Sequence, residues 1–419
     1  MKSIGRLLRA LGPGVTTGAA DDDPSGIATY SQAGAEFGFA LNWTMLLSYP
    51  LMAAVQEISA RIGRTTGKGI AANIHEWYPT WLLQPLIGLL LVANAINIGA
   101  DLGAMADAIA LLIGGPRLLY VALFSIFCAT LPIVVDYRRY AAILKWFTLA
   151  LFAYFGVLLT VQISWQDVAA GLFLPTFAQG AAFWTMVVAI LGTTISPYLF
   201  FWQASQEVEE IRAVREHEPL VKVPRQGPRA IRRIRFDTLF GMALSNLVAL
   251  AIMITTGATL HETGVYDIQS SSQAAEALRP IAGSFAFAVF ALGIVGTGLL
   301  AVPVLAGSAA YALAEACRLP ASLTLRPKDA KGFHATIALI TVGSGSINLA
   351  GFSPVKALVW SAVVNGVVAV PMLITMMNMA ASPRIMGKFT VERSLRFMGW
   401  LATAVMGIAT GVMVVTALS

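Results

Sequence analysis

Long apolar stretches recur along the whole chain and are separated by short polar segments. A helix needs about 20 mostly apolar residues to cross the hydrocarbon core of a bilayer. By that criterion the pattern predicts eleven membrane spans, over residues 11–35, 39–60, 82–113, 118–135, 141–163, 183–206, 237–260, 283–316, 332–350, 355–381 and 395–417. The sequence therefore predicts an all-α integral membrane protein.

Two of these spans are interrupted by polar and helix-breaking residues. The first contains the run DDDPSG at 21–26, and the sixth contains GTTISPY at 192–198. Interrupted helices in corresponding positions are typical of transporters built from two inverted repeats. We therefore expect one transmembrane domain over residues 1–419, with repeats at about 11–163 and 183–381 and an additional helix at about 395–417.

Basic residues are concentrated in every second connecting segment. If the N-terminus lies in the cytoplasm, 25 of the 28 Lys and Arg residues are cytoplasmic, and only Arg117, Arg279 and Lys356 are outside. This is the positive-inside distribution of a multi-pass protein, and it predicts a plasma or inner membrane location. The net charge of +6 thus reflects topology. It does not indicate a nucleic-acid partner, and we expect no obligate protein partner.

The break at 21–26 is the strongest candidate for a binding site. Unwound backbone inside a membrane is tolerated only where it is buried in protein or lines a cavity. Asp23 immediately precedes Pro24, which keeps Asp23 out of the helical region and frees local carbonyls. A carboxylate among free carbonyls is an all-oxygen site that suits a cation. Asp21 and Asp22 either share this role, or lie in a solvated outer funnel or cap the next half-helix.

Other polar residues inside the spans extend the candidate site. Thr193, Ser196 and Tyr198 at the second break offer two hydroxyls and a phenol, although hydroxyls in membrane helices often bond to their own helix. Asp101 in the third span could carry a proton or a counter-charge. Asn365 in the tenth span is expected to make a hydrogen bond between helices. The four histidines lack metal-ligand spacing and no nucleotide-binding motif is present, so we expect neither an enzyme nor a cofactor.

The longest connecting segment, about 207–236, is charged and contains Pro. Two interpretations stay open. The segment is a solvated connector, or its acidic residues Glu207, Glu209 and Glu210 form an inner vestibule mouth that attracts cations.

Short motifs spread along the chain point to one family. They are DPSG at 23–26, QAGA at 32–35, SAR at 59–61, TGK at 66–68, YP at 78–79 and ADL at 100–102. Together they resemble the natural resistance-associated macrophage protein (NRAMP) divalent-metal transporters over most of the chain. The resemblance implies a LeuT-like inverted-repeat fold, alternating access, and a metal site shared by the first and sixth helices.

The departures from the family pattern concern the metal site and the proton relay. The family's Asp-Pro-Gly-Asn reads DPSG here, so its Asn ligand falls on Gly26, and its Met-Pro-His reads Ser196-Pro197-Tyr198. The soft thioether and a histidine are therefore missing. Near Asp101, two family glutamates fall on Asn94 and Ala104, and the ninth span has no arginine.

Carried over residue by residue, the resemblance predicts a metal site and a coupling pathway. The predicted metal-site residues, with carbonyl ligands at two of them, are Ala20, Asp23, Gly26, Thr193 and Ser196. The candidates for coupling or for the ion pathway are Asp22, Gln56, Asp101 and Tyr198.

A site of carboxylate, hydroxyl and carbonyl oxygens favours Mg²⁺ or Mn²⁺ over softer transition metals. The pattern resembles the NRAMP-related magnesium transporters. The leading hypothesis is therefore uptake of a hard divalent cation, the transported substrate, into the cytoplasm with weak or absent proton coupling. The alternatives are proton-coupled Mn²⁺/Fe²⁺ uptake and a Na⁺- or H⁺-coupled symporter of a small organic solute on the same fold.

Overall fold

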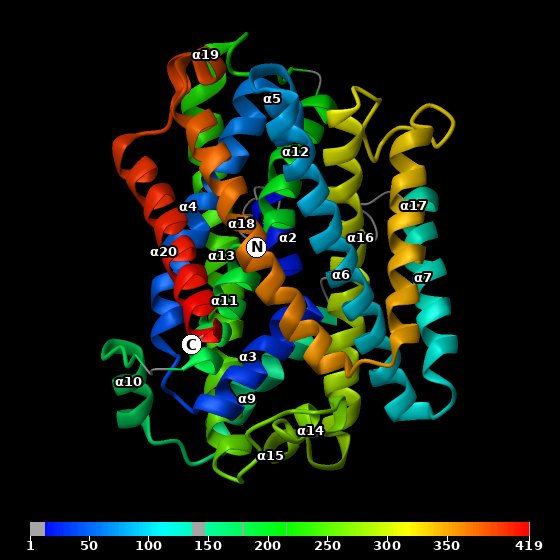
Figure 1. Cartoon of the computed structure of the whole chain (residues 1–419), viewed down its shortest axis with the longest axis vertical. Helices are drawn as coiled ribbons and strands as arrows, with labels where there is room; N and C mark the ends of the chain where they lie inside the picture. The colour runs from blue at the N-terminus through cyan, green and yellow to red at the C-terminus, as the bar shows by residue number, and fades with distance from the viewer. Residues whose placement is uncertain (1–12, 136–146, 178–179, 215, 419) are drawn as a thin grey trace, which may run out of the picture.

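The computed structural model describes residues 13–135, 147–177, 180–214 and 216–418, and these residues form helices and connecting turns without a strand. The helices run roughly along one direction and make a single bundle (Figure 1). The predicted all-α fold class is thus confirmed. The basic residues near the N-terminus and Arg138, Arg139 and Lys145 lie outside the described residues.

Both predicted breaks are present. The first span consists of α2 (Pro13–Asp21) and α3 (Pro24–Phe37), and the sixth of α11 (Ala181–Thr194) and α12 (Pro197–Ala213). In each case Pro is the first residue of the second half-helix. Pro is favoured there because its missing N–H would have no helical partner and its φ is already helical. The sequence therefore ends one half-helix and starts the next at the same depth.

The other predicted spans are also helical where the structure describes them. They are α4 (Trp43–Thr66), α6 (Thr80–Ile113), α7 (Arg117–Val134), η1 (Phe147–Phe152) with α9 (Ala153–Thr160), α13 (Gly227–Thr256), α16 (Ala286–Ala316), α17 (Lys331–Gly345), α18 (Pro354–Ala381) and α20 (Arg393–Leu418). Short elements connect them: α5 (Ile70–Trp77), α10 (Trp165–Phe173), η2 (Pro224–Gln226), η3 (Gly257–His261), α14 (Ser271–Glu276), α15 (Arg279–Ala282), η4 (Gly283–Phe285), η5 (Ser346–Ala350), α19 (Pro383–Met386) and η6 (Gly387–Phe389).

Eight helical segments of the described chain are long and apolar enough to cross a membrane on their own. The predicted first and second spans do not meet that criterion, nor does the described part of the fifth, whose residues 141–146 lie outside the described residues. The first is broken at its carboxylates, α4 carries Glu57, Arg61 and Arg64, and α9 is short. The charged residues of α4 and the unwound backbone of the first span must be buried against other helices, because lipid cannot satisfy their hydrogen bonds.

Tight helix packing surrounds the first break. α2 packs against α13 so closely that a Cβ on Gly18 would lie 2.4 Å from the carbonyl oxygen of Gly241. α16 packs along α6, and α11 along α18. Small residues let these backbones approach, as is usual for membrane helices. The break is therefore held in the middle of the bundle by helices from both halves of the chain.

The two ends of the bundle differ in their short helices. α5 and α19 lie at one end, and α10, α14 and α15 at the other (Figure 1). The distribution of basic residues predicts that the α5 end faces the cytoplasm. We call it the inner end.

At the inner end, the hypothesis of a free acidic vestibule mouth is wrong for Glu207 and Glu209. Both belong to α12 and both are buried. Glu207 forms an ion pair with Arg233 at 2.5 Å, and Glu209 accepts hydrogen bonds from the hydroxyls of Tyr311 and Ser322, each at 2.9 Å. These carboxylates hold α12 to α13 and α16 because a buried charge needs partners.

Candidate functional site

Asp23 lies in the gap between α2 and α3, and its two carboxylate oxygens have different partners. The side chain is 1% exposed. Oδ1 accepts hydrogen bonds from the Gly26 amide at 2.7 Å and the Ser25 hydroxyl at 2.8 Å, so it caps the N-terminus of α3. Oδ2 faces other helices: it accepts from the Asn97 amide at 3.2 Å and the Tyr198 hydroxyl at 3.3 Å. One oxygen therefore fixes the break, and the other is turned toward the rest of the predicted site.

Tyr198 joins the two breaks. It begins the first turn of α12, and its hydroxyl lies 3.1 Å from the carbonyl oxygen of Ala20 and 3.3 Å from Oδ2 of Asp23. The two oxygens share one donor, since a phenol has a single hydrogen. Ala20, Asp23 and Tyr198 thus meet, as expected if the first and sixth helices form one site.

Asn97 is the centre of the hydrogen-bond network, and the sequence reasoning missed it. Its side-chain nitrogen donates to Asp23 Oδ2 at 3.2 Å and to Asp101 Oδ2 at 3.1 Å. It is fully buried on α6, one turn before Asp101. That spacing places both side chains on one face of the helix, which is the sequence signal that could have identified it.

Asn365 brings α18 into the same network. Its amide nitrogen donates to the side-chain oxygen of Asn97 at 2.8 Å. Its own side-chain oxygen is buried and has no hydrogen-bond partner among the described residues. The predicted interhelical hydrogen bond is therefore present, and it ends on the residue that contacts Asp23.

The second break is closed by Ser196. Its hydroxyl donates to the carbonyl oxygens of Gly192 at 2.5 Å and Thr193 at 2.9 Å, which α11 leaves free at its end. A Cβ on Gly26 would lie 3.1 Å from the Thr193 hydroxyl oxygen, so Gly26 and Thr193 are neighbours. Thr193 and Gly26 thus lie beside the break, whereas the Ser196 hydroxyl is engaged with its own helix. Metal ligation by these three residues stays a prediction.

Asp21 and Asp22 lie on the α13 side of the break and are buried, so the interpretation as a solvated outer funnel is wrong. The Ser245 hydroxyl oxygen lies 2.6 Å from Asp21 Oδ2 and 2.9 Å from Asp22 Oδ1. Buried carboxylate oxygens need hydrogen-bond partners, and Ser245 provides one for this pair.

Gln56 is less clearly connected to the site. It is fully buried on α4, and neither polar atom of its side chain has a hydrogen-bond partner among the described residues. No described hydrogen bond links it to Asp23, so its role in the pathway stays a prediction.

The hydrogen-bond partners of Asp23 define the chemistry of the site. They are a backbone amide, two hydroxyls and a side-chain amide, all of which donate to the carboxylate. Carboxylate, amide and carbonyl oxygens are ligands for hard cations. A buried carboxylate between two broken helices of a membrane bundle is typical of secondary transporters.

The comparisons with known proteins identify the family. The family model "Natural resistance-associated macrophage protein-like" matches residues 14–416. The divalent metal cation transporter MntH of Klebsiella pneumoniae (strain 342) is 26% identical over 423 aligned residues, covering 98% of this chain and 95% of the relative. The chain therefore belongs to the natural resistance-associated macrophage protein family, which makes it a transporter and not an enzyme.

Solved structures agree on the fold. A crystal structure of the Eremococcus coleocola manganese transporter, in complex with an aromatic bis-isothiourea substituted compound, superposes with a TM-score of 0.74 at 19% identity. The match covers 98% of this chain and 86% of that one. A Na⁺-coupled sialic acid symporter superposes with a TM-score of 0.61 at 10% identity, covering 98% of this chain and 90% of that one. At such identities the likeness supports the shared transporter fold.

Proposed function

We propose that this protein transports a hard divalent cation, Mg²⁺ or Mn²⁺, into the cytoplasm by alternating access, with weak or absent proton coupling. The observation that carries the proposal is the set of groups around Asp23 Oδ2. They are the Asn97 amide, the Tyr198 phenol and the Ala20 carbonyl, and the Asn365 side-chain oxygen is one hydrogen bond further away. Asn97 turns its nitrogen toward Asp23 and its oxygen toward Asn365, so the oxygens nearest the break are those of Asp23, the Tyr198 hydroxyl and the Ala20 carbonyl. Oxygen ligands suit Mg²⁺ and Mn²⁺.

The relatives favour a second candidate. The Klebsiella relative is named a divalent metal cation transporter and the Eremococcus structure a manganese transporter. These names support a divalent transition metal such as Mn²⁺ as the ion. The alternative is Mn²⁺/Fe²⁺ uptake coupled to protons, with Asp101 as the group that would exchange a proton.

Transport by the purified protein in proteoliposomes separates the candidates. Uptake of Mg²⁺ and Mn²⁺ is measured in mutual competition and against Cd²⁺, at two external pH values and with an internal pH dye. We expect Mg²⁺ and Mn²⁺ to compete at similar concentrations, Cd²⁺ to compete poorly, and little proton entry. The proposal fails if Mg²⁺ neither enters nor competes. A proton current that accompanies the metal would instead establish the alternative.

Asp23→Ala tests the site itself. We expect this variant to lose uptake, because the carboxylate supplies the charge that replaces water around the ion. The matched control is Asp167→Ala, which removes a carboxylate at an exposed position on α10. Preserved uptake by Asp23→Ala would exclude Asp23 from the site.

A further inference from the structure

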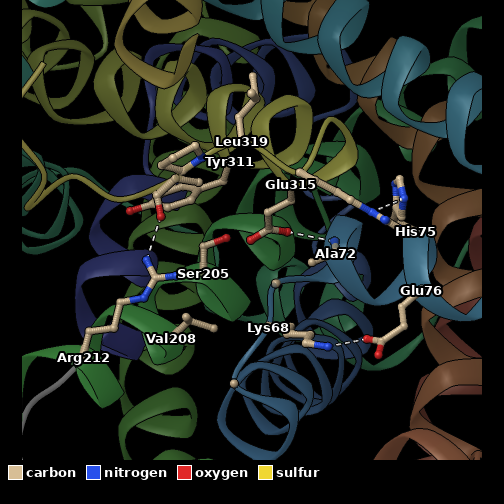
Figure 2. A pocket seen from close by; sticks show the side chains of 15 residues that line it. Lys68, Ala72, His75, Glu76, Ser205, Val208, Arg212, Tyr311, Glu315 and Leu319 are labelled. Atoms are coloured by element: carbon tan, nitrogen blue, oxygen red, sulfur yellow. Dashed lines mark hydrogen bonds and ion pairs between the residues drawn. The ribbon is translucent and has the colours of Figure 1, made fainter. Parts of the chain in front are cut away.

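A cavity of about 460 Å³ opens at the inner end, between α12, α16 and the turn that leads into α5. Figure 2 shows Tyr311 and Glu315 of α16 and Ser205 of α12 on one side of it, and the Lys68–Glu76 pair on the other. The Glu315 carboxylate accepts a hydrogen bond from the Ala72 amide at 3.0 Å. Arg212 and Arg318 line the same cavity, but within the described part of the chain neither forms an ion pair with Glu315 at 4.0 Å or less.

One face of α12 leads from the ion site to this cavity. Tyr198, Trp202, Ser205 and Arg212 follow one another at intervals of four, three and seven residues, which places them on a single stripe of the helix. Tyr198 contacts Asp23, whereas Ser205 and Arg212 line the cavity. Trp202 therefore stands between the site and the cavity.

α6 and α16, which face this stripe of α12, carry buried polar groups between the Asp23 site and the cavity. On α6, Asn94 lies one turn from Asn97 toward the inner end, and its amide donates to the carbonyl oxygen of Leu305 on α16 at 2.9 Å. The Asn94 side-chain oxygen and the Ser308 hydroxyl are fully buried and have no hydrogen-bond partner among the described residues. Leaving such groups unsatisfied is costly. They would be satisfied if water or a hydrated ion occupied this seam during transport.

An aromatic contact closes the seam. The Trp202 ring packs edge-to-face on Tyr311 with 6.2 Å between ring centroids. The ring also lies against Gly307, where a Cβ would be 2.6 Å from Trp202 Cζ3. Gly307 thus provides the space that Trp202 fills, and a large apolar side chain there excludes water from the path.

We infer that the cation leaves the Asp23 site along the α12–α16 seam, that Trp202 packed against Gly307 and Tyr311 is the inner gate, and that the ion enters the cavity beside Glu315. The Asn94 and Ser308 side chains offer polar contacts to the ion between the Asp23 site and the cavity. The inference rests on the proposed function, because it assigns the exit route of the same ion.

Cysteine accessibility tests the route without requiring transport. The background variant replaces the natural Cys128 and Cys317, and a membrane-impermeant maleimide is applied from the inner side. Ala72→Cys reports on the cavity, and Ser308→Cys reports on the seam at the depth of the gate. We expect rapid labelling of Ala72→Cys and at least tenfold slower labelling of Ser308→Cys. Adding Trp202→Ala should raise the rate at Ser308→Cys at least tenfold.

The control is Phe201→Ala, which truncates a buried aromatic residue next to Trp202 but off the stripe. It should leave the Ser308→Cys rate unchanged. If Trp202→Ala does not fold, Tyr311→Ala removes the opposite side of the same contact and should give the same increase. The inference is refuted if neither truncation changes the labelling of Ser308→Cys, or if Ala72→Cys reacts only from the opposite side.

Glu315→Gln tests the end of the route. We expect at least a threefold lower maximal uptake rate with an unchanged KM for the external ion, because only the exit is altered. An unchanged maximal rate would remove Glu315 from the route. If the cysteine labelling follows the expected pattern but Mg²⁺ is not transported, the proposed substrate is refuted while the gate is supported. Failure of the gate and failure of the proposed function are thus distinguishable.

Discussion

Asn97→Ala is the most informative perturbation of the site. The substitution removes the donor that Asp23 and Asp101 share, at 3.2 and 3.1 Å, and the acceptor that Asn365 uses at 2.8 Å. A hydrogen bond to a charged group contributes about 1.5–3 kcal/mol, so the two carboxylates together lose about 3–6 kcal/mol. Water entering the vacated space would restore part of this, because a water-mediated hydrogen bond is nearly as favourable as a direct one. A net loss of about 1.4–2.8 kcal/mol would weaken ion affinity about 10- to 100-fold, at about 1.4 kcal/mol for each factor of ten.

The assay is the concentration dependence of Mg²⁺ and Mn²⁺ uptake in proteoliposomes. Asn97→Ala should raise the KM for both ions by that factor, and Asn365→Ala by less, because among the described hydrogen bonds the Asn365 side chain bonds to Asn97 and not to Asp23. The control is Asn246→Ala, which removes a buried asparagine bonded to Ser48 at 3.1 Å. If Asn97→Ala leaves the KM within twofold of the unmodified protein, the network does not position the ion-binding carboxylate and the reasoning is refuted.

Three further perturbations test other parts of the structure. Gly26→Ala places a Cβ 3.1 Å from the Thr193 hydroxyl oxygen and 3.2 Å from the Asp21 carbonyl oxygen, so this variant should lower uptake at least fivefold. The control Gly88→Ala has open space around its Cβ and should not lower uptake. Equal activities of the two variants would contradict the close packing of the two breaks. Ser196→Met should increase competition by Cd²⁺ because a thioether is a soft ligand, and unchanged competition would show that this position does not face the ion. Arg233→Ala leaves the buried Glu207 without its ion-pair partner, which costs about 3–5 kcal/mol. The Tm of this variant in detergent should therefore fall well below the Tm of Arg279→Ala, which breaks an exposed pair. Similar Tm values would contradict a stabilising role for the Glu207 pair.

The sequence was sufficient for the broad architecture. Eleven apolar stretches and two interrupted spans predicted the helices and both breaks, because length, hydropathy and Pro position act locally. Helices and breaks do not depend on which helices become neighbours. The meeting of Ala20, Asp23 and Tyr198 does, and it was expected from the repeat pattern and the family resemblance, which pair the first and sixth helices.

The remainder depends on tertiary contacts that a single sequence does not show. Asn97 looked like an ordinary polar residue of a long apolar span, and only the approach of α3 and α18 to α6 makes it the centre of the network. Glu207 and Glu209 resembled a free acidic mouth because their partners, Arg233 and Tyr311, lie 26 and 102 residues further along the chain. The sequence predicts Ser196 as a ligand, which stays a prediction, but it does not show that the Ser196 hydroxyl bonds to carbonyl oxygens at the end of α11.

The centre of the site also bears on proton coupling. A proton relay needs groups that gain and lose protons in turn, and the link between Asp23 and Asp101 is the amide of Asn97. An amide nitrogen donates to both carboxylates at once and does not ionise near neutral pH. On its other side, Asn97 accepts from Asn365, which is again an amide. Asp101 is thus tied to the ion site by neutral donors that orient its carboxylate without offering a path for its proton, and this supports the weak coupling that we propose.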